Sequence, residues 1–174
     1  MDLGENGITA TLVFPVLRLS NQDIVFLGRK TKKFGAGLLN GWGGKVEEGE
    51  TILNAAIREL REESGLIAKT RDLVYVGRIT FYTQDRCKRI FNVLVHVFLL
   101  RKWRGQFRIG DGMKDPGWWP TNHLPIEKMM PADAHWVPSI FQGHKVIGDF
   151  LYGPEQKNVI WQEIRVVKHL GGVE

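Results

Sequence analysis

Three glutamates, Glu59, Glu62 and Glu63, are spaced so that their carboxylates would gather on one helix face. Residues three and four apart on a helix are neighbours, so these carboxylates would repel one another. The dipole near a helix C-terminus also disfavours negative charge. A hard divalent cation such as Mg²⁺ would resolve this conflict, because it prefers carboxylate oxygens and keeps waters for a phosphate substrate. The alternative is an ordinary solvated charged face.

The helix that would carry these glutamates is predicted over residues 51–64. Thr51 can cap its start, and Gly65 can end it in a left-handed conformation. Arg58 can neutralise part of the acidic cluster. One apolar face can pack on a sheet, and it consists of Leu53, Ala56, Ile57 and Leu60.

A glycine-rich loop over residues 34–49 leads into this helix. Such a loop permits unusual dihedral angles and a close approach of the backbone to a ligand. Around these elements we expect an α/β layered domain with a mixed sheet, because several strands alternate with few helices. The expected strands are 8–17, 24–27, 73–83, 90–101, 145–152 and 158–167, and short helices are expected at 124–130 and 135–142, with 116–120 as a loop.

Whole-chain properties fit one domain of 174 residues. Cys87 is the only cysteine, so an internal disulfide is impossible and a cysteine-based metal site is not expected. No apolar run approaches membrane-spanning length, and the acidic, polar start is unlike a secretory signal, so we expect a cytoplasmic protein. The net charge of +5 comes from scattered residues. This charge would suit nucleic acid or, equally, a small polyanion such as a nucleotide, and many proteins carry it without a functional partner. We expect a monomer or weak dimer.

The glycine-rich loop and the acidic helix together resemble the Nudix box of the MutT/Nudix superfamily. Every specified position of that pattern is filled, by Gly44, Glu50, Arg58, Glu59, Leu60, Glu62, Glu63, Gly65 and Leu66. The resemblance implies a single α/β/α sandwich with a mixed central sheet, one domain over residues 1–174 with its core at about 8–167. It also implies attack of water on a phosphorus of a nucleoside diphosphate linked to another group.

The resemblance assigns roles to the box residues. Glu59, Glu62 and Glu63 would ligate Mg²⁺, for which Mn²⁺ could substitute, and the Gly44 carbonyl would be a further ligand. Arg58 would orient a glutamate through a salt bridge. Glu50 would either support the loop–helix geometry or ligate the metal. The general base stays open among Glu50, Glu63, Asp111 and Asp115.

Residues 34–46 and 131–136 are also similar to the branch of the superfamily that hydrolyses oxidised purine nucleoside triphosphates. This similarity implies that Asn40 and Asp133 contact the purine, and that Lys30 meets phosphate or sugar. The apolar walls would be Phe34, Phe81, Met113 and Trp136. Each residue also has a structural explanation: asparagine makes turns, aspartate caps helices, and aromatic residues fill cores.

Three departures from that branch bear on the base that is bound. Ala132 replaces a second aspartate, Met130 replaces a tryptophan that flanks the base, and Gly112 replaces a glutamate. The alternatives are therefore a Nudix hydrolase of ADP-ribose, dinucleoside polyphosphates or RNA 5′ ends, or a nucleotide-binding module without catalysis. The intact glutamates argue against the module, and the scattered basic residues argue against an RNA substrate.

Overall fold

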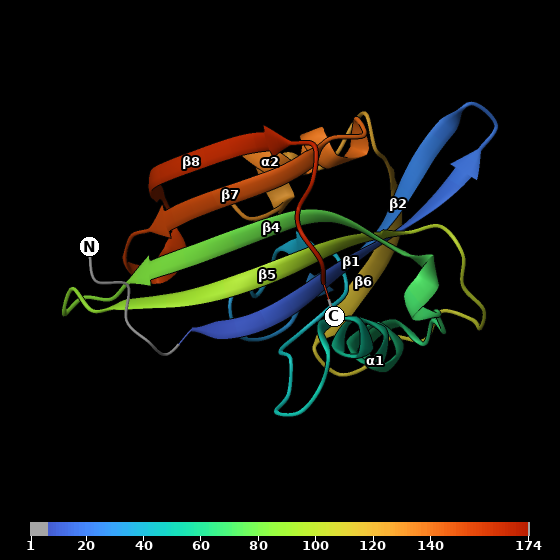
Figure 1. The fold of residues 1–174 in the computed structure, drawn as a ribbon, viewed down its shortest axis with the longest axis horizontal. Helices are drawn as coiled ribbons and strands as arrows, with labels where there is room; N and C mark the ends of the chain where they lie inside the picture. Colours follow the sequence, from blue (N-terminus) through green and yellow to red (C-terminus); the bar gives the residue numbers. More distant parts are fainter. Residues whose placement is uncertain (1–6, 174) are drawn as a thin grey trace.

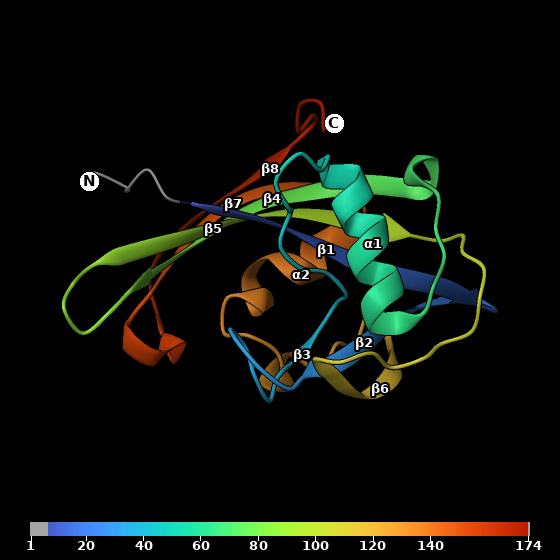
Figure 2. The same ribbon diagram turned by 90° about the horizontal axis from the view of Figure 1, so that it is seen from below.

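Strand β1 (Ile8–Leu19) is central to the sheet in this computed structural model, which describes residues 7–173. Most of β1 pairs in parallel with β5 (Ile90–Leu100), and its end turns back through a hairpin into antiparallel β2 (Gln22–Lys30). Strand β1 therefore connects the part of the sheet that contains β5 with the part that contains β2 (Figure 2). The expectation that no secretory signal is present concerns residues 1–6, which lie outside the described residues.

The sheet has eight strands in the order β3-β2-β1-β5-β4-β7-β8, and β6 pairs with β2 beside this path (Figure 1). The remaining strands are β3 (Leu39–Asn40), β4 (Leu73–Gln84), β6 (Met113–Pro120), β7 (Lys145–Tyr152) and β8 (Val159–Val167). The pairs β1–β5 and β4–β7 are parallel, whereas the others are antiparallel. The prediction of a mixed sheet is confirmed.

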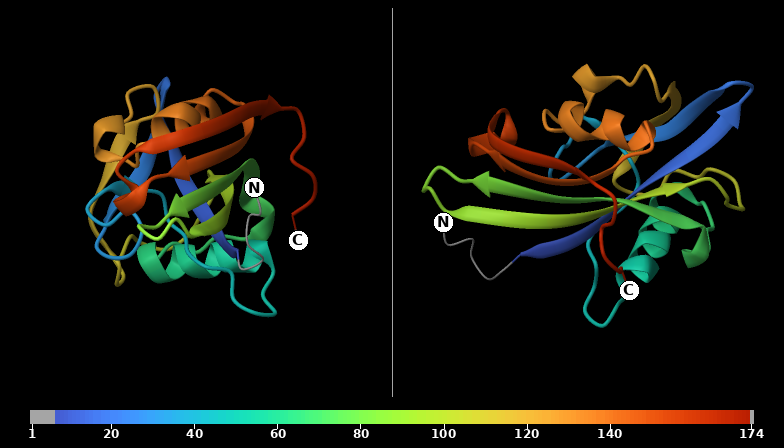
Figure 3. Two further views of the ribbon diagram at one scale, coloured as in Figure 1. Left: turned by 90° about the vertical axis from the view of Figure 1, so that its left-hand side faces the viewer. Right: turned by 45° about the horizontal axis from the view of Figure 1, so that its top comes forward.

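Alternation along β1 divides the core into two clusters, because successive side chains of a strand point to opposite faces. Leu12 and Phe14 belong to the cluster that contains residues of α2 (Asp133–Phe141). Val13 belongs to the cluster that contains residues of α1 (Ile52–Ser64). The two helices consequently lie on opposite sides of the sheet (Figure 3). This arrangement is the predicted α/β/α sandwich.

Helix α1 begins and ends as its sequence predicts. The Asn54 N–H donates to Thr51 Oγ1 at 3.2 Å, which satisfies one of the free donors at the helix start. Gly65 ends the helix with φ 75°, and its N–H donates to the Arg61 carbonyl at 2.9 Å. Glycine adopts this left-handed backbone without the cost that a side chain imposes.

Two local predictions are wrong. Residues 116–120 were expected as a loop but form the end of strand β6, which pairs only with β2 and can therefore contain prolines as edge strands do. Residues 124–130 were expected as a helix but contain only a single 3₁₀ turn at Ile126–Lys128. Within residues 7–173, neither helix has the length and apolar character that crossing a bilayer requires.

Candidate active site

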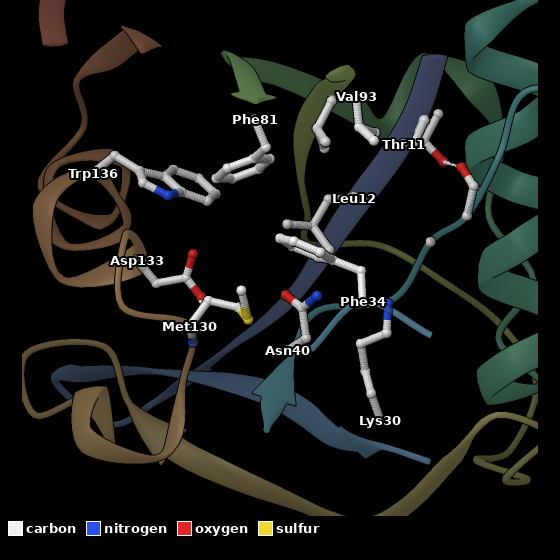
Figure 4. A pocket seen from close by; sticks show the side chains of 14 residues that line it. Thr11, Leu12, Lys30, Phe34, Asn40, Phe81, Val93, Met130, Asp133 and Trp136 are labelled. Atoms are coloured by element: carbon white, nitrogen blue, oxygen red, sulfur yellow. Dashed lines mark hydrogen bonds between the residues drawn. The ribbon is translucent and has the colours of Figure 1, made fainter. Parts of the chain in front are cut away.

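A cavity of about 150 Å³ lies between the sheet and α2 (Figure 4). Asp133 and Trp136 reach it from α2, whereas Asn40 and Lys30 reach it from β3 and the end of β2. Phe81 closes it from β4. The structure thus brings together, around this cavity, seven residues that the sequence predicts to belong to the site: Lys30, Phe34, Asn40, Gly44, Phe81, Asp133 and Trp136.

Asp133 is the acidic group at the α2 end of this cavity. Its side chain is 4% exposed, and its Oδ2 accepts a hydrogen bond from the Met130 N–H at 3.1 Å. Burial raises the pKa of Asp133 to about 7, although the hydrogen bond from the Met130 N–H opposes this shift and the Trp136 indole nearby opposes it too. Asp133 can therefore either donate or accept a hydrogen bond near neutral pH.

The indole N–H of Trp136 is a buried donor beside this carboxyl. It lies close enough to lower the pKa of Asp133, but it is not aligned for a hydrogen bond. Within the described part of the chain, Trp136 Nε1 therefore has no hydrogen-bond partner. Leaving a buried donor unpaired costs about 1–3 kcal/mol. A ligand or water in the cavity could remove that cost.

The contacts of Asn40 are compatible both with a role in a turn and with a role in ligand binding. Its Oδ1 accepts from the Gly41 N–H at 2.9 Å, as in a local turn. Its amide donors make no hydrogen bond among residues 7–173, so they remain available to an acceptor in the cavity. Lys30 lies between this cavity and the acidic helix. Burial lowers the pKa of Lys30, whereas the charge of Glu63 raises it.

Met113 does not line the cavity, so its nomination as a base-pocket wall is wrong. Met113 is buried in the cluster on the α1 side of the sheet. Its side chain lies close to Gly28 of β2, as does that of Trp42. Apolar wall residues from two strands were not predicted from the sequence. These residues are Ala10, Leu12, Val93 and Val95. Met130, which stands where the similar branch has a tryptophan beside the base, also lines the cavity, from the turn before α2.

The other end of the cavity is lined by Gly43 and Gly44, which contact glutamates of the acidic helix. Glu63 Oε2 accepts a hydrogen bond from the Gly43 N–H at 3.0 Å. Burial and, to a smaller extent, the charge of Glu59 raise the pKa of Glu63 to about 7, against the opposing effect of the Gly43 hydrogen bond. A Cβ on Gly44 would lie 2.5 Å from the Glu59 carboxyl carbon, so only glycine leaves room for this carboxylate. Two box glutamates thus gather at Gly43–Gly44.

Arg58 joins the loop to the helix. Its Nε and Nη2 donate to the two Glu50 oxygens at 2.8 and 2.9 Å, and its Nη1 donates to Glu59 Oε1 at 2.8 Å. Nη2 also donates to the Lys45 carbonyl at 3.0 Å. Arg58 is the main cause of the lowered pKa of Glu50. Glu50 is thus engaged as a bidentate partner that fixes the loop–helix geometry.

Glu62 is the most exposed of the three box carboxylates, and its Oε2 shares Arg58 Nη1, at 3.4 Å, with Glu59. Its side chain is 61% exposed, against 17% for Glu59, and it faces a separate open hollow on the outer side of α1. No three acidic, histidine or cysteine side chains among residues 7–173 converge as a ready metal site. The predicted ligand set Glu59, Glu62, Glu63 and Gly44 is therefore only partly assembled.

The donor set nevertheless fits a hard cation. Glu63 is partly buried and forms no salt bridge among the described residues. When it is ionised, the Gly43 N–H and the charge of Lys30 offset its charge only in part. The Gly44 carbonyl accepts hydrogen bonds from the Thr11 N–H at 2.8 Å and from the Thr11 hydroxyl at 3.5 Å, so the hydroxyl would have to turn away for this oxygen to ligate a metal ion. Rotation of the exposed Glu62 side chain would complete an oxygen-rich set.

Comparisons with known proteins agree with this geometry. The family model described as NUDIX domain matches residues 9–140, and the chain belongs to this family. The mouse oxidized purine nucleoside triphosphate hydrolase is 36% identical over 159 residues, which cover 91% of this chain and 97% of that protein. The zebrafish protein of the same name is 38% identical over 128 residues, or 74% and 78% of the two chains.

The fold has solved counterparts. A MutT protein from Bacillus halodurans superimposes with a TM-score of 0.73 at 21% identity, covering 90% of this chain and 97% of that one. The protein described here is a Nudix hydrolase, an enzyme class that uses divalent metal ions and acts on nucleotides.

Proposed function

We propose that this enzyme hydrolyses purine nucleoside triphosphates, oxidised ones included, to monophosphate and pyrophosphate in a Mg²⁺-dependent reaction, for which Mn²⁺ could substitute. Such a reaction removes damaged nucleotides from the precursor pool. The names of the mouse and zebrafish relatives support this substrate class.

One structural observation carries the proposal: a single cavity runs from a slot suited to a flat base to the glycines that contact the Nudix glutamates. Phe34, Phe81 and Trp136 provide apolar walls, and Asn40 and Asp133 add polar groups between them. Gly43 and Gly44, which contact Glu63 and Glu59, line the other end. A nucleotide with its base in the slot would direct its phosphates toward the acidic helix.

Each group at the acidic end has a distinct task. Bound Mg²⁺ would neutralise phosphate charge and lower the pKa of the attacking water. Glu59, Glu62 and Glu63 would hold it, with the Gly44 carbonyl. Lys30, at the junction between base and phosphates, would pair with a phosphate oxygen.

Two residues of the chain would prepare this end for reaction. Arg58 would hold the Glu59 carboxylate in place, and Glu50 would fix Arg58.

The base would be read by one acid and one amide. The Asn40 amide donors would meet an acceptor on the purine edge, and Asp133 would either accept from the base or donate to it. Ala132 is buried and adds no second acid, and Met130 supplies a soft, adaptable wall. We therefore expect a broader purine preference than a site with paired acids would have.

The proposal includes the setting of the enzyme. The whole chain would act as one catalytic domain in the cytoplasm, as a monomer or weak dimer. Its partner would be the small nucleotide rather than nucleic acid or membrane.

The test is hydrolysis across a substrate panel with Mg²⁺, scored by kcat/KM. The panel contains 8-oxo-dGTP, 2-oxo-dATP, dGTP, GTP, ADP-ribose and a 5′-triphosphorylated RNA. We expect one or more purine triphosphates to lead, with pyrophosphate as the released product. Preference for ADP-ribose or RNA would overturn the substrate assignment while leaving the Nudix chemistry intact.

Variants separate catalysis from binding. Glu62→Gln should abolish turnover and retain nucleotide binding, because it removes a metal-binding charge outside the base cavity. Glu48→Gln is the matched control, since Glu48 is an exposed glutamate of the loop before the helix. Full activity of Glu62→Gln would show that turnover does not depend on this carboxylate. Nucleotide binding by the wild type without any turnover would favour the nucleotide-binding module.

A further inference from the structure

Tyr152, the last residue of β7, lies behind the base cavity without lining it. Its side chain is fully buried. Its hydroxyl oxygen accepts a hydrogen bond from the Ala132 N–H at 3.0 Å. This hydrogen bond connects Ala132 to β7 of the sheet. Asp133, the acid proposed to contact the base, is the next residue in the sequence.

The start of α2 needs this support because its own sequence provides little. Ala132 occupies the N-cap position and offers no side-chain acceptor to the first turn. The preceding turn is closed by the Asp133 N–H to the Met130 carbonyl at 2.9 Å, and by the Met130 N–H to Asp133 Oδ2. Tyr152 adds the tertiary hydrogen bond that fixes this turn relative to β7.

The two parts of the tyrosine side chain support different parts of the cavity. The ring packs edge-on against Phe34, with centroids 5.8 Å apart, and lies 6.1 Å from the ring of Phe81. Both rings are cavity walls. The hydroxyl group, and not the ring, forms the hydrogen bond with the Ala132 backbone. Replacement by phenylalanine therefore removes the support of Asp133 and keeps the support of the walls.

We propose that Tyr152 is a positioning residue that acts through Ala132 to hold Asp133 where it reads the purine, and so contributes to base selectivity. This inference rests on the proposed function. Burial raises the pKa of the Tyr152 hydroxyl, and charge on Asp133 raises it further, so the hydroxyl keeps its proton. It remains a neutral acceptor for Ala132 at every pH at which the enzyme would work.

The first test compares Tyr152→Phe with the wild type on 8-oxo-dGTP, dGTP and dCTP. Loss of this hydrogen bond leaves the Ala132 N–H unpaired, so we expect KM for the purine substrates to rise roughly tenfold, equivalent to about 1.4 kcal/mol. We expect kcat, and both constants for dCTP, to stay within about twofold. An equal loss on dCTP, or no change on either purine, would overturn the proposal.

Tyr75→Phe is the matched control. The Tyr75 hydroxyl bonds to His96 Nδ1 at 2.8 Å, and Tyr75 packs with the cluster on the α1 side of the sheet, away from the cavity. It should leave purine KM unchanged. In an Asp133→Asn background, Tyr152→Phe should add nothing further. A full additional tenfold effect there would show that Tyr152 does not act through Asp133.

Hydrogen exchange at the Ala132 amide distinguishes failure of this inference from failure of the proposed function. Tyr152→Phe should speed exchange of that amide, and Tyr75→Phe should not. If the wild type hydrolyses no purine triphosphate but exchange accelerates, the substrate proposal fails and the positioning contact stands. If exchange is unchanged, the positioning role fails whatever the substrate is.

Discussion

Asp133 makes the stability of this protein depend on pH in an unusual direction. Its pKa is about 7 in the folded protein, against an ordinary value of 3.8. Between these values the folded protein retains a proton that the unfolded chain has released. The favourable contribution of Asp133 is therefore fully present below pH 4, and it is lost as pH rises through 7.

The size of the effect follows from the shift. Each pH unit between the two pKa values changes the free energy of unfolding by about 1.4 kcal/mol. From pH 5 to pH 8 only the two units below 7 contribute, so the loss is about 3 kcal/mol. Asp133→Asn is neutral throughout and can still accept from the Met130 N–H. Its stability relative to wild type should therefore rise by that amount between pH 5 and pH 8.

The assay is urea unfolding of both proteins without nucleotide at pH 5 and pH 8. The difference between variant and wild type matters, because carboxylates with lowered pKa values, such as Glu50, cancel from it. In melting temperature the expected change is roughly 6–12 °C for a chain of this size. Glu127→Gln, on an exposed turn, is the control. A difference between Asp133→Asn and wild type that stays constant with pH would refute the buried, protonated state.

Two further predictions concern the acidic end. Gly44→Ala should lower kcat about 100-fold, because its Cβ would displace the Glu59 carboxylate by an ångström or more. Steady-state kinetics beside Gly172→Ala, where a Cβ meets nothing, checks this, and equal activity of the two variants would contradict it. Arg58→Lys should lower the free energy of unfolding by about 2 kcal/mol, since an ammonium cannot bridge Glu50 and Glu59 as the guanidinium does. Urea unfolding measures this, and a wild-type midpoint would show that charge alone suffices.

Local features of this protein could be predicted from the sequence because their causes are local. The ends of α1 follow from Thr51 and Gly65, whose hydrogen bonds and dihedral angle involve only near neighbours. The first strand follows from its run of β-forming residues, Ile8 to Leu17. Residues 116–120 were misjudged for a related reason: two prolines and a glycine indicate a loop, but pairing with β2 at a sheet edge overrides that local preference.

What could not be predicted depends on which strands become neighbours. Ala10 and Val95 line the cavity together because β1 and β5 pair in parallel with these residues in register. No pattern within either strand specifies that register. The same holds for Tyr152, which is 20 residues from Ala132 in sequence and meets it only because α2 packs back onto β7. Spacing rules locate residues that perform chemistry together on one element, as Glu59 and Glu63 do. Residues that position such groups from another element can be identified only in the tertiary structure. Ala132, which stands where the similar branch has an aspartate, therefore has to be interpreted together with Tyr152, which binds its N–H.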